Sequence, residues 1–105
     1  MREPLGSGGR VLVLGLAQCP SARLREWAAT LTEGFLVGVG DHSEVRRARR
    51  ELADLANVLF TPGGREEIPW KEDFFTLILD AEGGAETAEM RRVLKGGGRI
   101  YSIQP

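Results

Sequence analysis

Five short apolar segments alternate with helical segments along the chain, and this alternation constrains the fold more than any other feature. The first two segments carry apolar residues at consecutive positions, which is typical of strands buried on both faces of a parallel sheet. Right-handed crossovers between such strands predict an α/β fold, an open sheet of five parallel strands in the order 3-2-1-4-5 with about three helices. The segments are RVLVLG (10–15), FLVGVG (35–40), VLFT (58–61), FFTLILD (74–80) and RIYSIQ (99–104).

Helices are expected between these strands, with one exception. The first covers 21–31 and begins at Ser21, a good N-cap residue. A second is expected after Asp41 and a third over 85–95, where the glycines at 96–98 would end it. The link between the third and fourth strands is rich in proline and glycine, so no helix is expected there. The apolar stripes of the first two helices are Leu24, Trp27, Ala28 and Leu31, and Val45, Ala48, Leu52 and Leu55.

Charge and composition limit the classes of function. The formal net charge of -1 gives no general attraction to nucleic acid or to an anionic membrane. No apolar run reaches the roughly 20 residues of a transmembrane helix. One cysteine cannot form an internal disulfide, and with one histidine it makes no zinc site, so a cytoplasmic location and no bound metal are expected. Residues 1–9 are interpreted as a flexible lead-in to a single domain, 10–105.

The loop after the first strand is the leading candidate for a binding site. Ligands of open α/β sheets bind beyond the carboxyl ends of the strands, where the backbone of a glycine such as Gly15 can approach them closely. The dinucleotide fingerprint G-x-G-x-x-G is incomplete, because Ala17 and Pro20 stand at its second and third glycine positions. Asp41 stands where an acid that binds ribose hydroxyls is expected. Alternatively, Asp41 and Ser43 cap the following helix, and the two roles are compatible.

Four stretches of the chain resemble the core of class I S-adenosylmethionine-dependent methyltransferases, in particular the small-molecule type called methyltransferase type 11. VLVLGLAQC matches the family's strand and glycine loop, and GVGDHSE matches its glycine, acid and serine after the second strand. EEIPWKEDFFTLIL matches a leucine-proline-aromatic stretch before a phenylalanine-aspartate strand. EMRRVLKGGGRIYSI matches a final arginine-valine-leucine-lysine run before glycines. The resemblance covers roughly 10–104 and implies a Rossmann-like methyltransferase fold.

The resemblance implies that S-adenosylmethionine is the cofactor and that a small molecule is the methyl acceptor. Methyl transfer is an in-line displacement, so positioning does most of the work and a base is needed only to deprotonate the acceptor. Asp80, with Glu82 nearby, is the candidate catalytic carboxylate, although acids just after a strand also serve as loop or cap residues. His42 either lies over the adenine edge or is exposed to solvent. The residues expected to bind the cofactor are Gly15, Ala17, Asp41, His42, Ile68 and Asp80.

The chain departs from the family's pattern at several positions. Val13 and Gly64 stand where the family usually has acids, and Thr76 stands where an aspartate opens the fourth strand. Each lost polar contact costs on the order of 1 kcal/mol or more, so binding of S-adenosylmethionine is predicted to be weak or absent, reduced by roughly two decades. The chain is interpreted either as a methyltransferase-like enzyme with weak or lost activity or as a non-catalytic module for protein–protein interaction. The N-terminal domain of anamorsin is similar to the second alternative.

The expected coverage of the sheet predicts a partner. The first two helices should cover one face and the helix at 85–95 most of the other, which leaves some apolar surface bare. Bare apolar patches usually mark interaction sites, and the fifth strand would be an open edge. A homodimer or a complex with another protein is therefore expected through this face or edge. A phosphoacceptor receiver domain shares the five-stranded layout, but it needs acids where this chain has Leu14 and Gly15.

Overall fold

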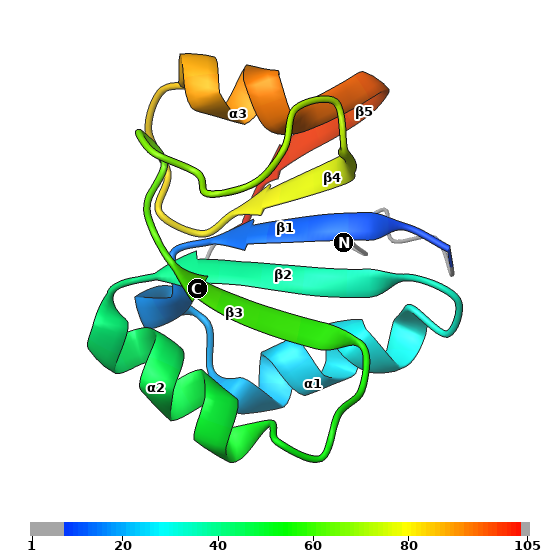
Figure 1. Ribbon diagram of the computed structural model, residues 1–105, viewed down its shortest axis with the longest axis vertical. Helices are drawn as coiled ribbons and strands as arrows, with labels where there is room; N and C mark the ends of the chain where they lie inside the picture. Colours follow the sequence, from blue (N-terminus) through cyan, green and yellow to red (C-terminus); the bar gives the residue numbers. More distant parts are fainter. Residues whose placement is uncertain (1–7, 104–105) are drawn as a thin grey trace.

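A computed structural model describes residues 8–103 as one open α/β sheet with helices on both faces (Figure 1). All strand pairings within the sheet are parallel, and the order is β3-β2-β1-β4-β5, which confirms the predicted topology. Most of the expected lead-in, 1–7, lies outside the described residues. The elements are β1 (Arg10–Leu14), the 3-10 helix η1 (Leu16–Gln18), α1 (Ser21–Thr30), β2 (Phe35–Gly40), α2 (His42–Glu51), β3 (Val58–Pro62), β4 (Phe75–Asp80), α3 (Ala88–Val93) and β5 (Leu94–Ser102).

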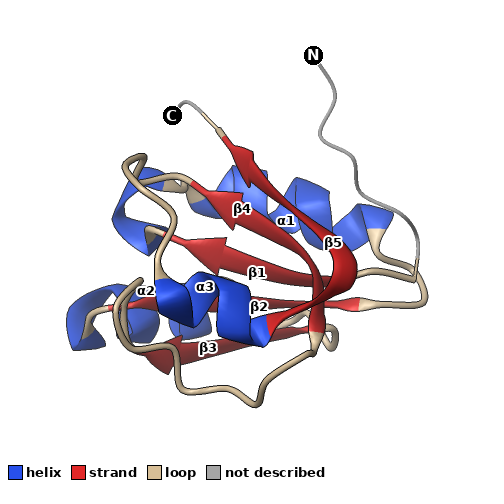
Figure 2. Ribbon diagram, turned by 90° about the horizontal axis from the view of Figure 1, so that it is seen from above, coloured by secondary structure: helices blue, strands red, loops and turns tan. Residues whose placement is uncertain are grey.

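The central strand β1 is buried on both of its faces. Helices α1 and α2 cover one face of the sheet, and α3 with the β3–β4 link covers the other (Figure 2). Val11 and Val13 belong to the core beneath α1 and α2, whereas Leu12 and Leu14 belong to the core beneath α3. Side chains alternate between the faces of a strand, so a strand covered on both sides must be apolar at every position.

The link between β3 and β4 covers the sheet face that was expected to be partly bare. Ile68 and Phe75 are buried in this core, and Trp70 and Phe74 pack against it. The ring centroids of Trp70 and Phe74 are 5.6 Å apart. The expectation of a bare apolar face is wrong for residues 8–103, in which Leu59 on β3 is the one exposed large hydrophobic side chain. A link without regular structure covers apolar surface because its aromatic residues supply the area that a helix would have supplied.

The start of α1 differs from the expected cap. Pro20 occupies the N-cap position, and Ser21 is the first helical residue. The Ser21 hydroxyl donates a hydrogen bond to the carboxylate of Glu51 at the end of α2. Ser21 therefore joins α1 to α2 instead of capping α1.

The other end of α1 is capped by a side chain from outside the helix. The side chain of Asn57 donates to the backbone oxygens of Ala28 and Leu31 at 2.8 and 3.0 Å, which satisfies carbonyls at the end of α1.

The third helix is shorter than expected and runs directly into β5. It ends at Val93, and the glycines at 96–98 lie inside the strand that follows. Phe75 of β4 pairs with Leu94, but Leu77 pairs with Arg99, so β5 carries an irregularity between these pairs. Gly97 has a φ of 86°, a conformation that glycine adopts without strain. The glycines were expected to stop the helix, and instead they let the strand bulge.

A carboxylate on α3 holds the β3–β4 link in place. Glu89 accepts a hydrogen bond from the backbone N–H of Ile68 at 2.9 Å, and its other oxygen accepts one from Arg92 at 2.6 Å. Arg92 also donates to the backbone oxygen of Ile68 at 2.8 Å. Hydrogen bonds from Arg92, and then from the Ile68 backbone, lower the pKa of Glu89 from its ordinary 4.5 to about 2.

This depressed pKa predicts an acid-sensitive link. The folded protein binds the proton of Glu89 less readily than the unfolded chain, so the contribution of this group is complete above about pH 4.5 and is lost as the pH falls towards 2. We expect Glu89→Gln to lower the urea midpoint at pH 7 and to lower it much less at pH 2.5. Glu86→Gln, which removes an exposed partner of Arg91, is the matched control and should shift the midpoint little at either pH. An equal effect of Glu89→Gln at both pH values would contradict the prediction.

Candidate functional site

The carboxyl ends of β1, β2 and β4 bring the predicted site residues to one edge of the sheet. Leu14, the last residue of β1, pairs with Val39 on one side and with Asp80 on the other. The loops that follow these strands therefore start side by side, on the left in Figure 1. This edge includes the position between β1 and β4 where the strand order reverses, which is where open α/β sheets bind ligands.

Gly15 turns the chain sharply out of β1. Its φ is 90° and its ψ is 56°, a left-handed conformation that favours glycine. The backbone oxygen of Gly15 accepts a hydrogen bond from the N–H of Gln18 at 2.9 Å, which closes the short helix η1. Leu16 is buried, whereas Ala17 and Gln18 are exposed at the edge. Gly15 itself is buried, so the loop presents the small side chain of Ala17 at the edge.

Asp41 caps α2. Its Oδ1 accepts hydrogen bonds from the backbone N–H of Glu44 and from the hydroxyl of Ser43, both at 2.9 Å. The Glu44 side chain completes a capping box with the backbone N–H of Asp41 at 3.1 Å. These bonds, led by the one from Glu44, lower the pKa of Asp41. The predicted cap is confirmed, and binding of a ribose stays a prediction. His42 is exposed.

Asp80 is the one charged residue that is fully buried among the described residues, with 1% of its surface exposed. Its two oxygens accept hydrogen bonds from the two terminal nitrogens of Arg65 at 2.9 and 3.1 Å. Oδ1 also accepts from the backbone N–H groups of Glu82 and Gly83, at 3.1 and 3.3 Å. A buried carboxylate needs such partners, and here they come from the residues that immediately follow β4 and from the link after β3.

Arg65 was not among the predicted site residues, yet it connects the two loops at this edge. It donates to the Glu82 carboxylate at 3.2 Å and to the backbone oxygen of Ala85 at 2.6 Å. Its pKa is raised, first by the hydrogen bond to Asp80. One signal in the sequence could have identified it. A lone arginine follows the glycine pair after β3, at the edge where the topology places Asp80.

Glu82 lies directly against the glycine loop. A Cβ atom at Gly15 would be 2.7 Å from Cγ of Glu82 and 3.2 Å from its backbone nitrogen. Ile68, the remaining predicted contact, is instead buried in the core beneath the link, with 2% exposure. The structure therefore brings together Gly15, Ala17, Asp41, His42 and Asp80, and places the Ile68 side chain in the hydrophobic core.

Cys19 and two arginines of α2, which lie near this edge, have structural roles. Cys19 is buried, and burial raises the pKa of its thiol to about 11, so the reactive thiolate is scarce at neutral pH. On the basic side of α2, Arg47 donates to the backbone oxygen of Leu16 at 3.1 Å and Arg49 to that of Phe60 at 2.9 Å. These two arginines make tertiary contacts, whereas Arg46 and Arg50 are exposed.

Within residues 8–103, no group of three or more His, Cys, Asp or Glu side chains is arranged to hold a metal ion. No helix in the same part is both long and apolar enough to span a bilayer.

Solved structures share this fold, although no family model and no curated protein matches the sequence. A chain of the Haloferax volcanii complex between the Trm112 methyltransferase activator and a protein assigned as a methyltransferase superimposes with a TM-score of 0.78, at 27% identity over 96% of this chain. A SAM-dependent methyltransferase from Aquifex aeolicus gives 0.74 at 20% identity over 87%, and a geranyl diphosphate methyltransferase in complex with SAM gives 0.74 at 18% over 96%.

The fold is that of the S-adenosylmethionine-dependent methyltransferases. The chain spans about half the length of these structures, which it covers to 47%, 53% and 44%. Open α/β sheets in general bind ligands beyond the carboxyl ends of their strands, at the point where the strand order reverses.

The buried ion pair predicts a large difference between two arginines. Arg65→Met leaves the carboxylate of Asp80 buried without its partner, and removal of one member of a buried pair costs about 3 kcal/mol or more. Arg91→Met removes an exposed pair with Glu86 and should cost less than about 0.5 kcal/mol. Urea unfolding at pH 7 measures both free energies. Equal losses for the two variants would show that Asp80 does not depend on Arg65.

Proposed function

We propose that this chain is an S-adenosylmethionine-binding domain of the methyltransferase type, which acts on a small-molecule acceptor and binds its cofactor weakly. One observation carries the proposal: Gly15 and Asp41 both lie at the sheet edge where the strand order reverses. Gly15, after β1, has a left-handed backbone conformation, and Asp41, after β2, is exposed. The solved methyltransferases of the same fold, one of them in complex with SAM, support it.

The polar groups at this edge fit an adenosyl cofactor. Asp41 uses Oδ1 for the helix cap, so Oδ2 remains for a ribose hydroxyl. Its lowered pKa keeps it a carboxylate at neutral pH, which makes it a stronger acceptor than a neutral group. Gly15 lies beside the exposed Ala17, and His42 is exposed beside Asp41. The cofactor, when bound, supplies a methyl group on a sulfonium sulfur, which is activated for transfer.

Asp80 acts in this proposal by positioning. Four hydrogen bonds from Arg65, Glu82 and Gly83 engage its oxygens, so it orients the loop after β4. Glu82 is the more accessible carboxylate, with a side chain 42% exposed. Weak binding follows from the sequence: Val13 and Gly64 replace acids that would add polar contacts, and each such contact is worth on the order of 1 kcal/mol.

Titration calorimetry with the demethylated product, S-adenosylhomocysteine, tests the proposal. We expect a dissociation constant on the order of 100 µM, roughly two decades above a micromolar site. Asp41→Asn should weaken binding at least about tenfold, because asparagine keeps an N-cap acceptor but loses the carboxylate charge. Ser43→Ala, which removes a cap hydrogen bond and leaves the carboxylate, is the control and should bind like the native chain. Absence of heat up to millimolar ligand would refute the proposal.

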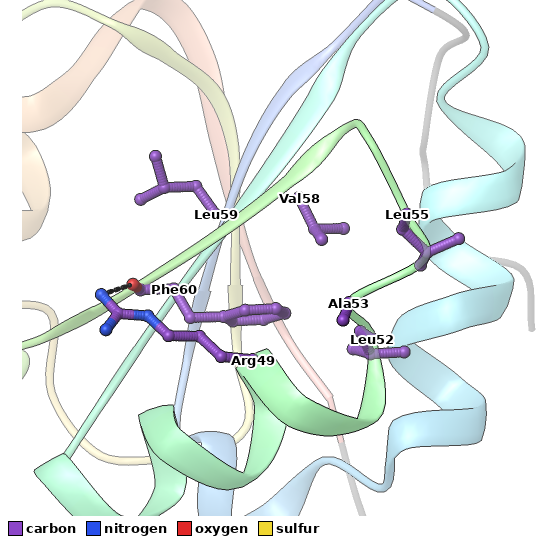
Figure 3. Close-up of a pocket in the computed structure, with 7 residues that line it drawn as sticks. All are labelled: Arg49, Leu52, Ala53, Leu55, Val58, Leu59 and Phe60. Atoms are coloured by element: carbon purple, nitrogen blue, oxygen red, sulfur yellow. Dashed lines mark hydrogen bonds between the residues drawn. The ribbon is translucent and has the colours of Figure 1, made fainter.

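A second candidate is a non-catalytic module that binds another protein through the edge strand β3, and one observation favours it. Leu59 is 44% exposed on this strand. Beside it lies a groove of about 260 Å³ that is lined by Val58, Phe60, Arg49 of α2 and residues just after α2 (Figure 3). Arg49 donates a hydrogen bond to the Phe60 carbonyl. The Haloferax volcanii structure, which contains a methyltransferase activator, supports a protein partner for chains of this fold. The homodimer was expected through the bare face or the edge strand β5, whereas this candidate places the contact at the opposite edge, β3.

Sedimentation equilibrium distinguishes self-association from a monomer that awaits another partner. If the edge joins two copies, the chain should be a dimer at about 10 µM, and Leu59→Asp should weaken dimerisation at least about tenfold, since a buried charge costs more than 1.4 kcal/mol. Ala56→Asp adds the same charge at an exposed position just before β3 and should leave the dimer unchanged. A monomer at all concentrations would exclude the homodimer.

A further inference from the structure

The space beside Gly15 is filled by a side chain of the protein itself. Cγ of Glu82 is so close to Gly15 that a Cβ there would approach it to 2.7 Å, and the backbone nitrogen of Glu82 would be 3.2 Å away. A glycine at this position is useful to a ligand because it leaves the backbone open to close approach. In this structure Glu82 occupies that approach.

One arginine holds Glu82 in this place. Nη1 of Arg65 bonds both to Oδ1 of Asp80 at 2.9 Å and to Oε1 of Glu82 at 3.2 Å. The two carboxylates differ in their surroundings. The Asp80 side chain is 2% exposed and is bound by both terminal nitrogens of Arg65, whereas the Glu82 side chain is 42% exposed and is bound by one. The bond to Asp80 is therefore part of the fold, and the bond to Glu82 can break at little cost.

We propose that Glu82 is a blocking residue of the cofactor edge: its side chain, held by Arg65, competes with the ligand for the space beside Gly15 and sets the affinity of the site. This inference rests on the proposed function. Binding requires the Glu82 side chain to leave Arg65 and rotate towards solvent, while Arg65 stays on Asp80 and Ala85. The ligand thus exchanges an existing ion pair for its own contacts, which lowers its net affinity.

Of the acids in residues 8–103, Glu82 is the one at this edge that lies against Gly15. Asp80 is bound by the two-pronged contact with Arg65, and Asp41 lies on the far side of β1, after β2. The amino-acid end of the cofactor carries both a carboxylate and an ammonium group, so the effect of Glu82 is steric, and its removal should relieve the overlap.

Calorimetry with S-adenosylhomocysteine is the first test, since this ligand has no net charge and is insensitive to the overall charge of the protein. We expect Glu82→Ala to bind it at least about tenfold more tightly than the native chain. Glu86→Ala is the matched control: it removes an exposed glutamate with a single arginine partner, four residues along the same loop, and should not change the affinity.

A double-mutant cycle is the second test and needs no ligand. Gly15→Ala should lower the urea midpoint, because the new Cβ meets Glu82 and because φ is 90°. In the Glu82→Ala background the contact with Cγ is gone, so the same substitution should cost less, by on the order of 0.5 M in the midpoint. In the Glu86→Ala background it should cost as much as in the native chain.

The two measurements separate failure of the inference from failure of the proposed function. Tighter binding by Glu82→Ala together with coupling to Gly15 supports the inference. Equal binding by the native chain and Glu82→Ala overturns the blocking role and leaves the proposed function standing. Coupling without binding by either chain overturns both the blocking role and the proposed function. Absence of coupling overturns the placement of Glu82 against Gly15, on which the inference is built.

Discussion

The burial of β1 on both faces is the constraint on which the rest of this structure depends. Every residue from Val11 to Leu14 is apolar and at most 1% exposed, so the chain must supply cover above and below the same strand. Two helices supply it on one side. On the other side the six-residue α3 is too short to do so alone, and the β3–β4 link must lie flat against the sheet. The link is thus a structural layer, although it contains no helix.

The position of the link explains the unusual chemistry of the carboxyl edge. The link leaves β3 at the carboxyl edge and crosses the sheet to the start of β4, so it passes the loop that follows β4. Arg65 lies where the link passes this loop. Its ion pair with Asp80 joins the link to the strand, and Thr87 donates to the Arg65 carbonyl at 2.7 Å. The same contacts that fasten the cover to the core therefore bring Arg65, Asp80 and Glu82 beside the glycine loop. Coverage of the core and the electrostatics of the candidate site have one common origin.

The sequence was sufficient for the strand order, the missing third crossover helix and the cap at Asp41, because these depend on local patterns of apolar and capping residues. It was not sufficient for Ile68 and Trp70, since a Pro/Gly-rich segment gives no sign of which side chains will turn inward. The glycines at 96–98 were misinterpreted for a related reason: a glycine run can end a helix or bulge a strand, and the register with β4 decides between them. Arg65 was missed because its partner is fifteen residues away in sequence.

The helix cap at Asp41 affects how chains of this fold can diverge. One of its oxygens stabilises the start of α2, so selection for a stable helix preserves this aspartate whether or not a cofactor is bound. A lineage that abandoned the cofactor would keep it, while the loop after β1, which has no comparable duty in the helix cap, would be free to drift. An acid after the second strand therefore has a structural reason to be present in chains of this fold, with or without a ligand.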